Sequence, residues 1–238
     1  MRKLSSYIIS KSLLSITLII CICGCDTDEP IVNPDSTGQK GQLTDIQGNV
    51  YKTIGIGSQI WLAENLRSTK LNDNTEIKFF KDSIDWSSTS ENGYSWYNND
   101  TVMKIPYGGL YSWNTVNSGK LCPIGWHIPS EDEWYTLVNK LGGKDVAGGK
   151  LKVIGIDFWL DRNNGATNSS KFNAVPSGDV FYGHFWSLGK SSCWWSSTES
   201  DTIFVITTSL SNKSPGVLIG PGGRRSSCGL SVRCIKNQ

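Results

Sequence analysis

The side chains of residues 50–56 alternate in polarity in the way that a half-buried β-strand requires. Gly57 and Ser58 then supply a turn, and residues 59–62 resume the apolar character, so the pattern predicts a β-hairpin over residues 50–62. Two later segments, residues 202–208 and 230–235, are rich in β-branched side chains and are predicted to form strands near the end of the chain.

A helical period begins after residue 129. Ser130 is a suitable N-cap, and Glu133 stands three residues later, where it completes a capping box. The apolar positions that follow at i, i+3, i+4 and i+7 form one stripe: Trp134, Leu137, Val138 and Leu141. Gly142 and Gly143 can end the helix through positive φ angles. Because helix capping explains the acidic residues of this segment, we do not expect them to act as an acid/base cluster.

Residues 148–178 show neither period and are rich in turn-forming residues, which predicts a long loop. Short antiparallel strands, one or two helices and long loops together indicate an α+β fold. We find no internal repeat of the length typical of solenoids or propellers. From residue 42 to residue 238 the chain is long enough for one sizeable domain, and no second linker divides it.

An apolar run over residues 12–22 precedes all of these elements and is short for a membrane span, which needs about 20 residues. Its basic flank consists of Arg2, Lys3 and Lys11. Gly24 and Cys25 follow shortly after this run, which is the arrangement of a lipoprotein signal. We therefore predict a cleaved signal peptide over residues 1–24 and acyl chains on Cys25. An ordinary secretory signal or an N-terminal anchor helix is the alternative.

Residues 25–41 are polar and rich in proline, glycine and acidic side chains, which predicts a flexible tether between a lipid anchor and the domain. Asp26, Asp28 and Glu29 resemble the export signal that places lipoproteins of the Bacteroidetes on the outer face of the outer membrane. A plain solvated linker explains the same residues. We therefore expect a lipid-anchored protein of the outer membrane or cell surface, with the membrane as its first partner.

Charge argues against nucleic acid as a partner. Removing the leader leaves 20 basic and 21 acidic residues, a formal net charge of −1, and no basic stripe. The chain has 25 Gly and 10 Trp, which favours many tight turns around large aromatic side chains.

Four cysteines remain in the domain after the leader and the lipidated residue are set aside: Cys122, Cys193, Cys228 and Cys234. In an exported protein this even number predicts two disulfides, and spacing alone leaves all three pairings open. A zinc site is the rival interpretation, but there is no C-x-x-C motif, and the chain has only two histidines, His127 and His184.

Eight short motifs follow one another in a fixed order. They are DIQGNVY at 45–51, WLAENL at 61–66, WYNND at 96–100, YGGLYSW at 107–113, LCPIGWHIP at 121–129, AGGKLK at 147–152, WWSSTE at 194–199 and SVRC at 231–234. In content and order they resemble the Fibrobacter succinogenes major paralogous domain family, and the resemblance covers nearly the whole domain. That family in turn resembles the C-type lectin-like fold, and residues 125–134 look like a segment of formylglycine-generating enzymes.

The resemblance implies that the first and last strands pair, so that both ends of the domain lie together and long loops form the opposite surface. It also implies two disulfides, Cys122–Cys234 and Cys193–Cys228. Each would close a long loop and stabilise the fold by about 3 to 4 kcal/mol in a chain-entropy description.

We therefore expect a non-catalytic binding or adhesion domain whose ligand is a polysaccharide or another envelope component. Tryptophan rings stack on the apolar faces of sugars. Five tryptophans near predicted loops are the candidate platforms: Trp86, Trp96, Trp113, Trp159 and Trp186. Four other tryptophans are assigned instead to the core: Trp126, Trp134, Trp194 and Trp195.

No cofactor is expected, apart from calcium at a weak candidate site of oxygen ligands formed by Asp161, Asn163 and Asn164. A structural role in the envelope or in a surface appendage is the first alternative function. An enzyme related to formylglycine-generating enzymes is the second, although Cys228 and Cys234 do not reproduce the spacing of the copper-binding cysteine pair of those enzymes.

Overall fold

The first and last strands of the domain lie in one antiparallel sheet, which we call the terminal sheet. The structure, a computed structural model, describes residues 37–88 and 90–238. Across the terminal sheet the strands run in the order β1 (Lys40–Thr44), β2 (Val50–Ile56), β3 (Gln59–Leu62), β14 (Ile235–Lys236) and β7 (Trp126–His127). The expectation that the first and last strands pair is wrong, because β1, β2 and β3 form a meander whose third strand, β3, takes the place beside β14.

The domain begins slightly earlier than the sequence suggested. Residues 40 and 41 were assigned to the tether, yet they form the start of β1, where Lys40 pairs with Ile54. A Cβ atom at Gly41 would lie 2.9 Å from the Thr53 hydroxyl oxygen, so glycine permits this close approach. The polar composition of β1 hid this strand, because only one of its side chains is even partly buried.

The predicted hairpin over residues 50–62 is confirmed as β2 and β3, whose register pairs Thr53 with Leu62 and Ile56 with Gln59. The turn between them contains Gly57 at a φ of 62°. Tyr51 and every residue from 53 to 56 are buried, so this hairpin contributes directly to the core.

The predicted helix is confirmed as α4 (Glu131–Lys140), and its capping box is complete. The Ser130 hydroxyl accepts from the Glu133 amide at 3.2 Å, and the Glu133 carboxylate accepts from the Ser130 amide at 2.8 Å. The other carboxylate oxygen of Glu133 lies 2.8 Å from Nε2 of His127, which ties the helix start to β7. Gly142 and Gly143 follow at φ angles of 98° and 95°, and the apolar stripe is buried.

A six-stranded sheet holds the middle of the domain. Its strands run in the order β4 (Lys78–Phe79), β5 (Gly93–Ser95), β6 (Leu110–Ser112), β13 (Cys228–Leu230), β8 (Asp179–Phe181) and β9 (His184–Trp186). Only the β4–β5 pair is parallel among the named strands of the described residues. Strand β9 is the last strand in this order, so it is an edge strand and has a strand neighbour on one side only.

The third sheet has three strands, β10 (Ser191–Glu199), β11 (Phe204–Ser211) and β12 (Leu218–Arg224). The strand predicted over residues 202–208 is β11, which begins two residues later. The strand predicted over residues 230–235 is divided between β13 and β14, because the chain crosses from the middle sheet to the terminal sheet over residues 231–234. The architecture is mixed α+β with mostly antiparallel strands.

Helix α4 is the only helix of the described residues longer than five residues. The others are α1 (Ser83–Trp86), η1 (Tyr97–Asn99), η2 (Thr101–Met103), α2 (Lys104–Tyr107), α3 (Trp113–Asn117) and α5 (Ala147–Leu151). The long loop predicted over residues 148–178 thus begins as α5. Its two glycines concealed the helix from the sequence pattern, and they are needed because a Cβ at Gly148 or Gly149 would lie 2.1 Å from a carbonyl oxygen.

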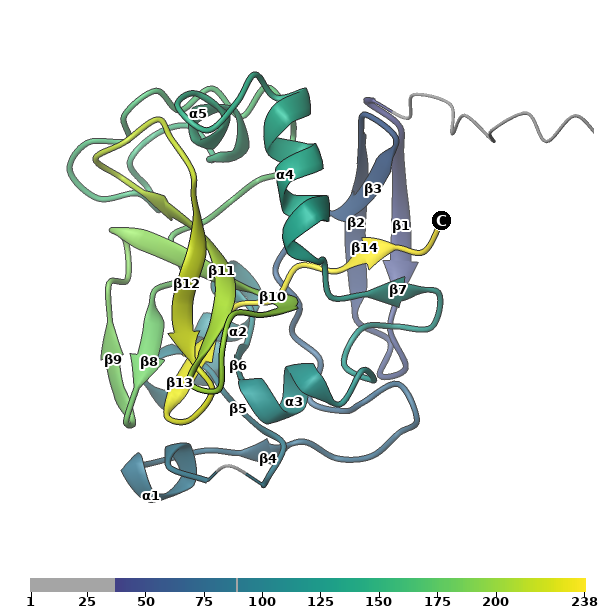
Figure 1. The fold of residues 1–238 in the computed structure, drawn as a ribbon, viewed down its shortest axis with the longest axis vertical. Coiled ribbons are helices and arrows are strands. Elements are labelled where there is room, and N and C mark those ends of the chain that lie inside the picture. Colours follow the sequence, from purple (N-terminus) through teal and green to yellow (C-terminus); the bar gives the residue numbers. More distant parts are fainter. Residues whose placement is uncertain (1–36, 89) are drawn as a thin grey trace, which may run out of the picture. The chain divides into compact units, whose positions relative to one another are not determined.

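Aromatic side chains fill the space around α4, which stands between the terminal sheet and the β10–β12 sheet (Figure 1). The ring of Trp134 lies 4.8 Å from that of Trp61 and 6.2 Å from that of Trp194. Trp134, Trp194 and Trp195 are fully buried, as predicted, whereas Trp126 is only partly buried.

Arg233 is fully buried in this core without a described carboxylate in hydrogen-bond contact. Its guanidinium donates to Asn65 Oδ1 and to three backbone carbonyls, those of Leu62, Phe172 and Asn173. Burial lowers the pKa of Arg233 to about 9. The side chain therefore joins the end of β3, the crossing segment and the long loop through hydrogen bonds.

Of the two predicted disulfides, one is present. Cys122 and Cys234 are bonded, with a Cα–Cα distance of 5.9 Å and a sequence separation of 112. The Cys193–Cys228 pairing is wrong, since both residues are free thiols. Each sulfur has its own hydrogen-bond partner, Thr207 for Cys193 and the backbone of Arg224 for Cys228, and burial raises the two pKa values to about 12 and about 11.

Candidate binding face

The hairpin of β8 and β9 presents one side outward at the edge of the middle sheet. Its two-residue turn is Tyr182-Gly183, at φ angles of 48° and 77°, as a type I′ turn requires. Val180 pairs with Phe185 across the hairpin, and Val180 is fully buried, so this pair marks the inner side. The pairs on the other side are Asp179 with Trp186 and Phe181 with His184.

Trp186 is the most exposed aromatic side chain of the described residues, at 57%. It is held on a short, twisted hairpin rather than on a free loop. The glycine at 178 allows this, because a Cβ there would lie 2.3 Å from the Trp186 carbonyl oxygen. An exposed indole on a fixed backbone is a ready platform for an apolar ligand surface.

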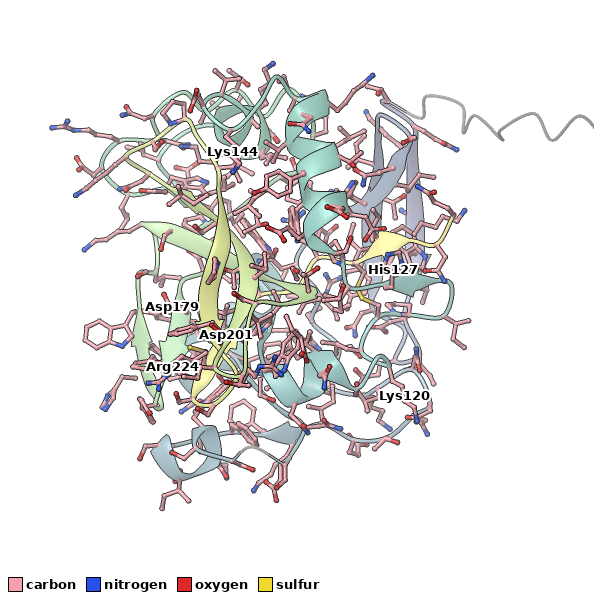
Figure 2. All side chains as sticks on the ribbon, viewed as in Figure 1. Lys120, His127, Lys144, Asp179, Asp201 and Arg224 are labelled. Atoms are coloured by element: carbon pink, nitrogen blue, oxygen red, sulfur yellow. A yellow bond between two sulfur atoms is a disulfide. The ribbon has the colours of Figure 1, made fainter. Side chains whose placement is uncertain are left out.

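Asp179 adds a carboxylate directly across the hairpin from Trp186. Burial raises the pKa of Asp179, while a hydrogen bond from the Ser187 side chain opposes the shift. Figure 2 shows Asp179 and Arg224 on the same side of the molecule, where β8 and β12 lie. The Nε atom of Arg224 is buried and has no hydrogen-bond partner among the described residues. The face thus places a carboxyl group across the hairpin from the indole.

A cavity of about 390 Å³ lies at the end of the three-stranded sheet where β10 begins and β11 ends. Its polar lining consists of Ser191, Ser209, Ser211, Ser214, Lys144 and Asp145, and its apolar lining includes Leu210, Pro215, Val217 and Leu218. The volume falls within the range of about 300 to 1,000 Å³ that is typical of small-ligand sites. Hydroxyl groups can both donate and accept hydrogen bonds, so this lining suits a ligand with many hydroxyls.

Ser191 connects the cavity to the hairpin. It lines the cavity, its amide donates to the Ser187 carbonyl at 3.0 Å, and its carbonyl accepts from the Gly178 amide at 3.0 Å. Ser187 directly follows Trp186, the last residue of β9. We call Trp186, Asp179 and the lining of this cavity the binding face.

Lys152 fixes the loops around the cavity. Its side chain is fully buried, and its ammonium group donates to three backbone carbonyls, those of Asn164, Ser211 and Ser214, at 2.8, 3.0 and 2.8 Å. Two of these residues, Ser211 and Ser214, line the cavity. Burial lowers the pKa of Lys152 to about 8, whereas the carbonyl oxygens favour its charged form.

Four of the five tryptophans predicted as sugar platforms are buried, so the prediction is wrong for them. Their exposed fractions are 1% for Trp86, 4% for Trp96, 5% for Trp113 and 0% for Trp159. Each fills a core position. The ring of Trp86, for example, lies 5.2 Å from the ring of Phe80, and the ring of Trp113 lies 5.5 Å from the ring of Trp195. Trp186 alone of the five can contact a ligand.

The loop of Asp161, Asn163 and Asn164 uses its amides as donors. The Asn163 amide donates to the carbonyls of Val153 and Gly155, and the Asn164 amide to that of Lys213. The backbone carbonyl oxygen of Asn164 could have faced a cation, but it already accepts a hydrogen bond from the Lys152 ammonium group. Across residues 37–88 and 90–238, no three His, Cys, Asp or Glu side chains gather as a metal site would require.

The predicted lipidation residue, Cys25, lies outside the described residues, as do the predicted signal peptide and most of the predicted tether. Within the part of the chain that the structure describes, no helix is both long and apolar enough to cross a membrane.

The Fibrobacter succinogenes major domain family matches residues 54–236. The chain belongs to this family. As a member of the Fibrobacter succinogenes major domain family, it has the α+β core described above, with the matched segment running from β2 to β14. No curated protein and no solved structure matches the chain.

Sequence reasoning missed most of the binding face. Asp179 and the cavity serines stand in no motif, although Ser209 and Ser211 repeat at the two-residue period of a strand face, and Ser191 pairs with Ser211 across β10 and β11. Lys152 and Arg233 belong to the AGGKLK and SVRC motifs, but the sequence alone did not predict that their side chains are buried and bind backbone carbonyls.

Proposed function

We propose that this chain is a non-catalytic binding domain of a lipid-anchored surface protein and that its ligand is a saccharide held at the binding face. The observation that carries the proposal is the combination of Trp186, exposed on the β8–β9 hairpin, with a serine-lined cavity that Ser191 connects to the end of that hairpin. Sugars present apolar C–H faces and many hydroxyls, so one unit of an oligosaccharide could stack on the indole while the hydroxyls of another unit bind in the cavity.

The arrangement of the domain supports an outward-facing site. The first strand and the C-terminus lie on one side, and the β8–β9 hairpin lies on the opposite side (Figure 1). If Cys25 carries acyl chains, the tether would attach the domain from the side of the terminal sheet. The binding face would then point away from the membrane. The same separation of termini and loops supports a C-type lectin-like arrangement.

The chemistry of the cysteines supports binding over catalysis. A nucleophilic cysteine needs a lowered pKa, whereas burial raises the pKa of both Cys193 and Cys228. The first alternative, a structural part of the envelope or of an appendage, predicts that no soluble glycan binds.

A glycan array probed with the purified protein tests the proposal. Wild-type protein should bind a defined subset of plant or host polysaccharides, and Trp186→Ala should lose at least tenfold in affinity for them, or about 1.4 kcal/mol. Ile124→Ala is the matched control, since Ile124 is 83% exposed and lies in the loop before β7. Absence of any glycan binding at millimolar concentration would favour the structural role.

A further inference from the structure

Two adjoining cavities lie beside the terminal sheet. One, of about 340 Å³, is bounded by β1, β2 and residues 171–173, and the other, of about 280 Å³, lies between the same strands and the end of α4. They share Lys40, Ile54 and Lys171, so they form one continuous groove. We call it the lysine groove.

Five lysines, each from a different segment of the chain, line this groove. They are Lys40 on β1, Lys52 on β2, Lys140 at the end of α4, Lys150 on α5 and Lys171 in the long loop. Lys40 pairs with Ile54, and Gln42 with Lys52, so Lys40 and Lys52 stand on the same face of the sheet. The described residues that line the two cavities include no Asp or Glu.

Residues 37–238 carry 20 basic and 17 acidic residues, a formal net charge of +3, so the five lysines of the groove outnumber the excess positive charge of the whole domain. Lys40, Lys52, Lys150 and Lys171 form no ion pair with any acidic residue of the described chain. Cations that are gathered in a concave surface with no carboxylate in its lining create a local positive potential.

The floor of the groove is apolar. Ile54 and Ile56 line it and are each 2% exposed, and Ala63 and Leu141 add further aliphatic surface. A bare inorganic anion would gain nothing from this surface. A sugar ring that carries an anionic substituent would place its C–H face on the floor and its charge among the ammonium groups.

We propose that the lysine groove is a second binding site, specific for anionic saccharide units that carry carboxylate, sulfate or phosphate groups. It is independent of the site proposed above, since the two share no residue. A long polyanion such as nucleic acid would meet the net negative charge of the rest of the domain, which favours a short charged segment as the occupant.

Calorimetric titration of the full chain tests this site, with oligogalacturonate and heparin oligosaccharides as saccharide probes and glycerol phosphate as the probe of a lipid headgroup. The double charge reversal K40E/K171E should weaken saccharide binding at least tenfold. The control reversal K213E/K236E changes net charge equally at exposed lysines outside the groove and should leave affinity within twofold. Thermal melts of both variants establish that each is folded.

Three outcomes would overturn the proposal: no binding of either oligosaccharide by the wild type, equal weakening by both double variants, or binding of glycerol phosphate alone. The last would reassign the groove to lipid headgroups. Trp186→Ala should leave the binding of anionic probes unchanged, so failure of this site and failure of the saccharide site at Trp186 are distinguishable.

Discussion

Replacing Lys152 with methionine tests how the loops of the binding face are held. Methionine keeps much of the volume and the apolar stem of lysine, but it removes the donors that reach the carbonyls of Asn164, Ser211 and Ser214. The variant therefore isolates the ammonium group rather than creating a large cavity.

The size of the effect follows from two opposing contributions. Three hydrogen bonds from a charged group are worth about 1.5 to 3 kcal/mol each, or about 5 to 9 kcal/mol together. Removing the buried charge regains about 3 kcal/mol, because the pKa of Lys152 is lowered from 10.5 to about 8. Asn164 and Ser214 are exposed residues whose carbonyls can turn to water, so we expect the net loss near the lower end, at about 3 kcal/mol.

Urea unfolding followed by circular dichroism measures this loss. Lys150→Met is the control, because Lys150 is on α5, which ends directly before Lys152, is only partly buried and makes no described ion pair. We expect it to change stability by no more than about 0.5 kcal/mol. A loss below about 1 kcal/mol in Lys152→Met would refute the reasoning that the buried ammonium organises these loops.

Three further predictions address the cysteines and the binding face. Replacing both Cys122 and Cys234 with alanine should cost about 4 to 5 kcal/mol in urea unfolding, since the bond spans 112 positions, and an unchanged midpoint would contradict the bond. Alkylation of denatured, unreduced protein, mapped by mass spectrometry, should label Cys193 and Cys228, and labelling of neither would mean that they are oxidised. Burial raises the pKa of Asp179, so the folded state favours the protonated carboxyl. Ionisation of this carboxyl at higher pH therefore lowers the free energy of unfolding, and the loss is recovered as the pH falls. Asp179→Asn should therefore raise the melting temperature at pH 7 but not near pH 3, whereas a lower melting temperature at pH 7 would show that the ionised carboxylate is stabilising.

Local signals in the sequence predicted local structure well. The alternation over residues 50–62 and the capping box at Ser130 both depend on residues that are close in the chain, and the structure confirms both. Which strands pair with one another, when they are far apart in the sequence, could not be predicted from such local patterns. The segment around Arg233 has the composition of one strand, yet its residues are divided between two sheets, and the buried guanidinium between them binds carbonyls on the end of β3 and on the long loop.

The binding face was only partly predictable for the same reason. In the sequence Trp86 and Trp186 are equivalent, each near turn-forming residues, but one fills the core and the other is exposed on an edge strand. Exposure is decided by which sheet edge remains uncovered, and that depends on tertiary packing. The Tyr182-Gly183 turn, flanked by apolar and aromatic residues, was the one local signal that could have located the hairpin.

Calorimetric titration of the best glycan from the array against three proteins tests the central claim most directly: wild type, Trp186→Phe and Trp186→Ala. A stacked sugar needs a flat aromatic face, so Trp186→Phe should retain affinity within a few-fold while Trp186→Ala loses at least tenfold. Equal affinity of all three proteins for the glycan would contradict the assignment of Trp186 as the binding platform.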